Sequence, residues 1–168
     1  MNEVYTIRSE EGDEYKLQFT TNRSGVIADA ILDKLESEGI SVVEIGLERT
    51  KGQSFTNHRV LAQIEQCIAD VILTRPNVML TFFCDFISLL PTMKKDMAVQ
   101  EYRSRLFSRM FERYVEQHHI DDVFNRVTVV EGMAENYYFH VIARRHHLVY
   151  ADMISVGIQK DYGKPSEE

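Results

Sequence analysis

The stretch "VMLTFFC", residues 78–84, constrains the fold more than any other part of this chain. Apart from Thr81, the side chains on both faces of this stretch are apolar. Successive side chains of a strand point to opposite faces, so a strand that is apolar on both sets needs cover on both faces. The stretch therefore predicts a central strand in a well-covered sheet.

Five further segments have strand character. Residues 4–8 and 14–20 alternate between apolar and polar, with Tyr15, Leu17 and Phe19 on one face, and the acidic loop 9–13 between them contains Gly12. This pattern predicts a hairpin. Residues 124–131 and 137–144 predict a second hairpin, and residues 40–48 predict a single strand followed by a polar loop over 49–54.

Four segments have helical spacing. A short helix is expected between Ser24, a candidate N-cap, and Gly39, a candidate end. A second helix, with Asn57 or Thr56 as its N-cap, stops before Pro76, and a long third helix covers about residues 93–117 after Pro91. A fourth helix is expected over 148–160, with Val149, Met153 and Val156 pointing inward.

This order of elements predicts an α+β fold. We expect a mixed β-sheet of about six strands, with hairpins at both ends and helices packed mainly on one face. Residues 1–162 are expected to form a single α+β domain, and residues 163–168 a disordered C-terminal tail. The strand order does not follow from the sequence.

Composition narrows the functional classes. The formal net charge of −7 argues against a protein whose main partner is nucleic acid, although a local basic patch stays open because the bases concentrate after residue 94. Residues 1–5 have no signal-peptide character, and no apolar run is long enough for a membrane span. Cys67 and Cys84 lack CxxC spacing, which disfavours a disulfide framework or a zinc site. We expect a cytoplasmic protein with reduced thiols.

The most distinctive segment is "EYRSRLFSRMFERY", residues 101–114, which carries four arginines. On a helical wheel, Arg105 and Arg109 lie at the edge of the apolar arc, where solvent suffices to explain them. Arg103 and Arg113 lie inside the arc. A guanidinium in an apolar surface keeps its charge, so these two side chains need partners.

Three interpretations of Arg103 and Arg113 stay open. Either can be tied to Asp85, which follows the central strand, in a structural ion pair. Alternatively, the arginines and Asp85 form a site for phosphate or for a partner's carboxylate. The third interpretation is a long side chain that reaches water along its aliphatic stem. The candidate Asp/Arg cluster consists of Asp85, Arg103, Arg105, Arg109 and Arg113.

"FFCD" at residues 82–85, followed by "RSRLFSRMFERY" at 103–114, resembles an uncharacterised family of small bacterial proteins known as a domain of unknown function. In that family a strand ends in Cys-Asp and an Arg-x-Arg-x-Phe helix follows. The matching positions are Cys84, Asp85, Arg103, Arg105, Leu106, Phe107, Arg109 and Phe111. Met110 stands where the family pattern has tryptophan. The resemblance implies a bacterial origin and no particular activity.

Other motifs have simpler interpretations. Adjacent His118 and His119 point about 100° apart on a helix, so a helix end is favoured over a metal site. Residues 144–147 with nearby tyrosines are compatible with RNA contacts, but a solvated strand end is favoured. His58 and His140 are interpreted as structural histidines, and Cys84 as an inert buried thiol. Phosphate-binding loops and serine-elbow motifs are absent from the sequence.

The leading functional hypothesis is a non-catalytic bacterial binding or protein-interaction module without a cofactor. Its many Met, Phe and Tyr side chains suit an interface, and we expect self-association as a homodimer or a protein partner. The alternative is a binder or enzyme that acts on a phosphorylated ligand or RNA through the Asp/Arg cluster.

Overall fold

The structure is a computed structural model, and it describes residues 1–21, 25–52, 57–84, 97–132 and 136–163. Within these residues the chain forms a six-stranded sheet and four α-helices. The strands are β1 (Asn2–Arg8), β2 (Glu14–Thr21), β3 (Ser41–Lys51), β4 (Val78–Cys84), β5 (Val123–Glu131) and β6 (Asn136–Arg144). The α-helices are α1 (Asp29–Ser37), α2 (His58–Thr74), α3 (Val99–Gln117) and α4 (Leu148–Tyr162), and a 3₁₀ turn, Arg145–His147, precedes α4.

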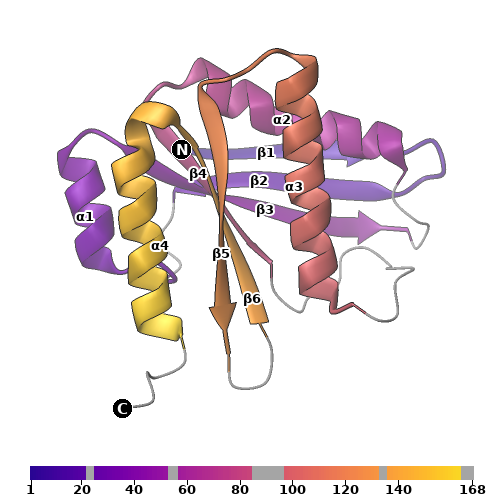
Figure 1. The fold of residues 1–168 in the computed structure, drawn as a ribbon. Coiled ribbons are helices and arrows are strands. Elements are labelled where there is room, and N and C mark those ends of the chain that lie inside the picture. Colours follow the sequence, from indigo (N-terminus) through magenta and orange to yellow (C-terminus); the bar gives the residue numbers. More distant parts are fainter. Residues whose placement is uncertain (22–24, 53–56, 85–96, 133–135, 164–168) are drawn as a thin grey trace.

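The strand order is β1-β2-β3-β4-β6-β5 (Figure 1). Strands β3 and β4 are parallel and are connected through α2, whereas all other neighbours are antiparallel. The predicted mixed sheet with a hairpin at each end is therefore confirmed. The final hairpin places β6, not β5, beside the central strand β4, so β5 forms an edge of the sheet.

Helices cover both faces of the sheet, so the prediction that they pack mainly on one face is wrong. Leu80 and Phe82 of β4 belong to a core with α2 and α3, whereas Met79 belongs to a second core with α1 and α4. We call these the α2/α3 layer and the α1/α4 layer; Figure 1 shows the two pairs of helices apart. The physical reason is the central strand itself, because an apolar set on each side needs its own cover.

Local signals explain most helix boundaries. Asn57 Oδ1 accepts a hydrogen bond from the Val60 amide at 3.0 Å, so Asn57, one of the two predicted candidates, is the N-cap of α2. After α1, Gly39 adopts φ 76°, and the Ile40 amide donates to the Leu35 carbonyl at 2.9 Å. A left-handed glycine of this kind ends a helix in a Schellman turn. The proposed cap Ser24 and the predicted start of the third helix at residue 93 lie outside the described residues.

Helix α4 is rotated relative to its prediction. Val149 and Val156, predicted to point inward, are 69% and 68% exposed. The residues that pack on the sheet are Ala151, Ile154 and Ile158. Apolar residues occupy two stripes of this helix, so periodicity alone could not select the buried stripe.

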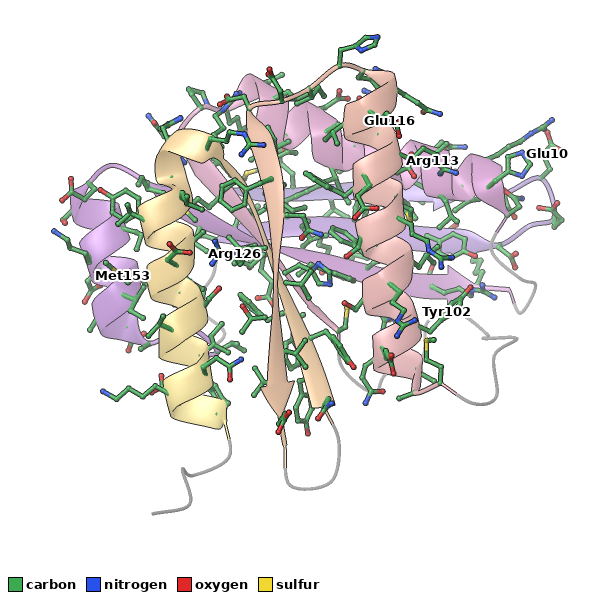
Figure 2. The ribbon with its side chains drawn as sticks, viewed as in Figure 1. Glu10, Tyr102, Arg113, Glu116, Arg126 and Met153 are labelled. Atoms are coloured by element: carbon green, nitrogen blue, oxygen red, sulfur yellow. The ribbon has the colours of Figure 1, made fainter. Side chains whose placement is uncertain are left out.

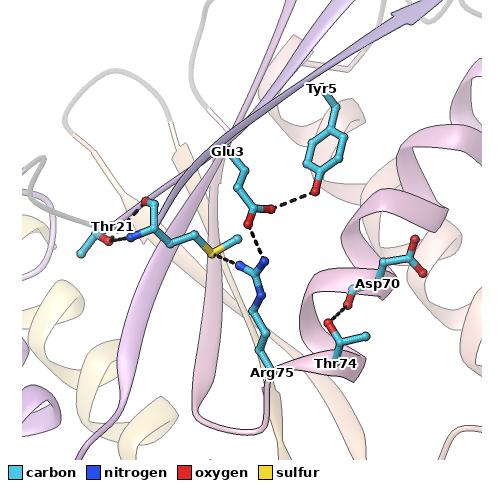
Figure 3. Close-up of polar contacts among 7 residues, drawn as sticks. Glu3, Tyr5, Thr21, Asp70, Thr74 and Arg75 are labelled. Atoms are coloured by element: carbon cyan, nitrogen blue, oxygen red, sulfur yellow. Dashed lines mark hydrogen bonds and ion pairs between the residues drawn. The ribbon is translucent and has the colours of Figure 1, made fainter.

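The strand β3 is longer than predicted. It runs to Lys51, which pairs with Glu14, instead of ending at residue 48. At the edge of the sheet, β1 is tied to the end of α2, because Glu3 accepts hydrogen bonds from Arg75 and from the Tyr5 hydroxyl (Figure 3). No helix in the described part of the chain is long and apolar enough to span a bilayer.

Candidate functional site

The arginine segment forms most of α3, but its buried face differs from the predicted apolar arc. Gln100, Arg103, Ser104 and Met110 are its buried residues, whereas Tyr102 is only half-buried. Figure 2 shows Tyr102 and Arg113 toward opposite ends of this helix. The helix therefore turns a partly polar face to the sheet, and Arg103 is 7% exposed, in agreement with its predicted position inside the structure.

The other three arginines lie at the surface. Arg105 Nη2 is 2.7 Å from Glu101 Oε1 one turn earlier, and Arg109 is exposed. Arg113 differs from its prediction, because its side chain is 54% exposed and its Nη2 lies 2.9 Å from Glu65 Oε1 of α2. A carboxylate partner for Arg113 was expected, but Glu65 fills that role across the two helices.

Asp85 lies outside the described residues, so its proposed pairing with Arg103 stays a prediction. The four arginines point to different surroundings: Arg103 lines an apolar pocket, whereas Arg105 and Arg113 are paired with Glu101 and Glu65. The described residues do not gather them into one anion-binding cluster.

A pocket lies between α2 and α3, and we call it the α2/α3 pocket. Its cavity volume is about 50 Å³, and it opens to solvent. Its walls are apolar, apart from Glu65 and the Tyr114 hydroxyl at the rim. The main lining residues are Ile68, Ala69, Ile72, Leu73, Phe107, Met110, Phe111, Val115, Ile120, Val123 and Ile142.

The pocket exists because α2 and α3 touch in a limited region. The Glu65–Arg113 ion pair and a 3.3 Å hydrogen bond from the Tyr114 hydroxyl to Gln66 connect them. A second apolar pocket, which includes Arg103, shares Ile68, Phe107 and Met110 with the first. These three side chains thus form a wall between two hollows.

A buried polar network lies next to this region. Ser104 Oγ of α3 is 2.8 Å from His140 Nε2, and His140 Nδ1 is 3.0 Å from Asn125 Oδ1. Asn125 Nδ2 donates to Ser108 Oγ at 3.3 Å, so its Oδ1 accepts from His140 Nδ1–H. His140 Nε2 then accepts the Ser104 hydroxyl proton, and every member of the network is satisfied.

The order serine, histidine, asparagine resembles a nucleophile, its base and an orienting group. Here, however, His140 is 0% exposed and Ser104 is buried. Burial lowers the pKa of His140 from 6.5 to about 4, so the imidazole is neutral at pH 7. Neither Ser104 nor His140 lines the α2/α3 pocket. The network is therefore a structural connection between α3 and the final hairpin, as predicted for His140.

The remaining candidates have structural roles or simple surroundings. Arg144 donates to the carbonyls of Ile72 and Leu73 at 3.2 and 2.9 Å, which satisfies the C-terminal end of α2. His118 and His119 are exposed, and the described residues contain no group of three or more potential metal ligands. Cys84 is buried, as predicted, and burial raises the pKa of the half-buried Cys67 thiol.

Sequence reasoning missed Ser104, Asn125 and the α2/α3 pocket. Ser104 could have been noticed as a polar residue within one helical turn of Phe107, on the face that packs inward. Asn125 could not, because its proximity to His140 depends on which strands pair at the end of the chain. The pocket depends on how two helices cross, which no local pattern encodes.

A comparison with protein-family models and with curated proteins found no match for this chain.

Proposed function

We propose that the protein is a non-catalytic binding module and that the α2/α3 pocket binds a small, uncharged, mostly apolar molecule. The observation that carries this proposal is the lining of the pocket. Among the described residues that line it, Glu65 is the only charged one, and Arg113 already neutralises Glu65.

The chemistry of the pocket favours such a ligand. An apolar wall offers no hydrogen bonds to replace those that a charged ligand loses with water. An uncharged apolar molecule loses few such bonds and gains contact with Phe107, Phe111 and Met110.

The alternative, a binder or enzyme acting on a phosphorylated ligand or RNA, has less support. Carboxylates neutralise Arg105 and Arg113, so a phosphate would have to displace Glu101 or Glu65. The Ser104–His140 pair is buried away from the pocket. We therefore favour binding over catalysis.

The proposal is tested by titration with N-phenyl-1-naphthylamine, an uncharged apolar dye whose fluorescence rises in apolar surroundings. We expect saturable binding to the wild-type chain. The Ala69→Met substitution places a longer side chain in the pocket wall and should weaken binding by about tenfold or more, equivalent to about 1.4 kcal/mol.

The matched control is Ala62→Met. Ala62 lies on the exposed side of the same helix and does not line the pocket, so dye binding should stay close to wild type. Thermal unfolding confirms that both variants are folded. Equal dye binding by the two variants, or no saturable binding by the wild-type chain, would overturn the proposal.

A further inference from the structure

We propose that the protein forms a two-fold symmetric dimer in which β5 pairs antiparallel with β5 of a second copy. Within the described residues, β5 has a neighbour only on the β6 side. It spans nine residues, Val123–Glu131. Strand edges of this kind are templates for pairing, because their backbone groups lack partners. This inference goes beyond the pocket proposal and does not depend on it.

The backbone shows which residues of β5 face outward. The Asp122 carbonyl, just before the strand, accepts from the Arg145 amide on the β6 side at 2.8 Å. The Val129 carbonyl instead accepts from the Gln159 side chain of α4 at 2.6 Å. Because outward and inward backbone groups alternate along a strand, the odd-numbered residues present their N–H and C=O groups to the free edge.

The same odd-numbered positions carry exposed apolar side chains. Val127 and Val129 are 37% and 41% exposed. They lie on the face of the sheet where Asn125 reaches Ser108 of α3. A β-branched apolar pair beside outward-facing backbone groups is the combination that edge strands normally avoid.

One pairing register joins the outward backbone groups of β5 and also covers its exposed valines. A two-fold axis through Thr128 places Val127 opposite Val129 of the second copy, and both residues exchange their outward N–H and C=O groups. The exposed valines then cover each other. Gln159 gives way to the second strand at the Val129 carbonyl, since its own side chain is exposed and can return to water.

Helix α4 lies along β5 on the opposite face of the sheet from Val127 and Val129. Its residues Asp152 and Ser155 contact Arg126 and Thr128 of β5, so α4 lies along the edge strand; Figure 2 shows Arg126 between β5 and this helix. On its other flank, Gly157 lies against Ile31 of α1. At about 100° per residue, the exposed Val149 and Val156 lie between Asp152 and Gly157, on the face of α4 turned away from the sheet. The symmetry that pairs β5 also brings the two α4 helices side by side.

Charge favours a second copy at this surface. The whole chain carries a net charge of −7, so two copies repel each other over most of their surfaces. Strand β5 carries one arginine and one glutamate, which cancel, and Arg126 is paired with Asp152 of α4. Strand β5 therefore adds no net charge to the pairing of two copies.

The test is the solution mass of the full chain by light scattering coupled to gel filtration. We expect a dimer of twice 19.6 kDa for the wild-type chain. Val127→Lys and Val129→Lys should give monomers, because each places two like charges in the centre of the pairing. The matched control is Val4→Lys, which changes an exposed valine of the other edge strand, β1, and should leave the dimer intact.

Hydrogen exchange gives a second, position-specific readout that needs no variant. The amides of Val127 and Val129 should exchange slowly at dimer-forming concentrations and quickly on dilution, while the Thr128 amide, which faces β6, stays slow at both. A wild-type chain that stays monomeric, a dimer that tolerates lysine at both Val127 and Val129, or fast exchange of these two amides in the dimer would each overturn the proposal.

Discussion

The two helical layers differ in what they expose and in what they bury. The α1/α4 layer exposes Val149 and Val156 above a core built on Ile154. The α2/α3 layer buries Ser104 and His140 between α3 and the sheet. The contrast is one of degree, because Val127 and Val129 are exposed on the α2/α3 side and the Thr128–Ser155 hydrogen bond is buried on the α1/α4 side.

The helix pairs also differ in how they meet. In the α1/α4 layer, a Cβ atom at Gly157 would lie 2.5 Å from Ile31 Cδ1, so glycine permits a close approach. In the α2/α3 layer the helices cross, with pockets on either side of Phe107 (Figure 1). The α1/α4 layer also keeps a hollow, a cavity of about 130 Å³ lined by Val26, Phe83, Val130, Tyr137, Ile158 and Tyr162.

The largest expected effect tests the orientation of α4. Ile154→Ala should lower the free energy of unfolding by about 2–5 kcal/mol, because it leaves a cavity under the helix. Val156→Ala removes an exposed side chain and should change stability by less than about 0.5 kcal/mol. Urea unfolding at low protein concentration measures both without a contribution from dimerisation. Similar losses for the two variants would contradict the observed orientation and restore the predicted one.

A second prediction concerns the buried histidine of the α2/α3 layer. The folded-state pKa of His140 is lowered to about 4, whereas the unfolded chain has the ordinary value near 6.5. As the pH falls below about 6.5, the unfolded state binds a proton that the folded state does not, so stability decreases until about pH 4. The pKa difference corresponds to a total loss of about 3 kcal/mol.

Carboxylates titrate in part of the same pH range, so this measurement needs a reference variant. His140→Gln retains hydrogen-bonding groups but does not titrate, and it should lose the contribution of His140 between pH 6.5 and pH 4. Urea unfolding of both chains at several pH values isolates the difference. If the two stability profiles run parallel, His140 does not stay neutral in the folded state.

The sequence predicts where the helices and strands of both layers lie along the chain better than it predicts which side of each helix is buried. Strand β4 is apolar on both sides, so its central position and its buried state follow directly. The cap Asn57 and the terminating Gly39 act through local backbone chemistry, which a sequence displays. Helix α4 has two apolar stripes and α3 buries Ser104, so in both helices tertiary packing decides the orientation that periodicity leaves ambiguous.

In the candidate site, too, features of a single helix follow from the sequence, whereas contacts between elements do not. Burial of Arg103 and exposure of Arg105 and Arg109 follow from the helical wheel of one helix. The pairing of Arg113 with Glu65 does not, because it requires the position of α2 relative to α3. The contact between His140 and Ser104 likewise requires the strand order, which brings β6 next to β4 and under α3.

The smallest expected effect concerns this Arg113–Glu65 pair, whose carboxylate lines the α2/α3 pocket. Because the Arg113 side chain is 54% exposed, solvent screens the pair, and Arg113→Ala should cost no more than about 1 kcal/mol in urea unfolding. The loss should shrink at high salt. The control is Arg105→Ala, which breaks a pair with Glu101 inside one helix and should cost about 0.3–0.5 kcal/mol.

Removal of Arg113 also leaves Glu65 unpaired beside an apolar wall, so it should weaken dye binding while Arg105→Ala does not. A salt-independent loss of several kcal/mol would instead mean that Arg113 is a structural core residue, as the helical wheel first indicated.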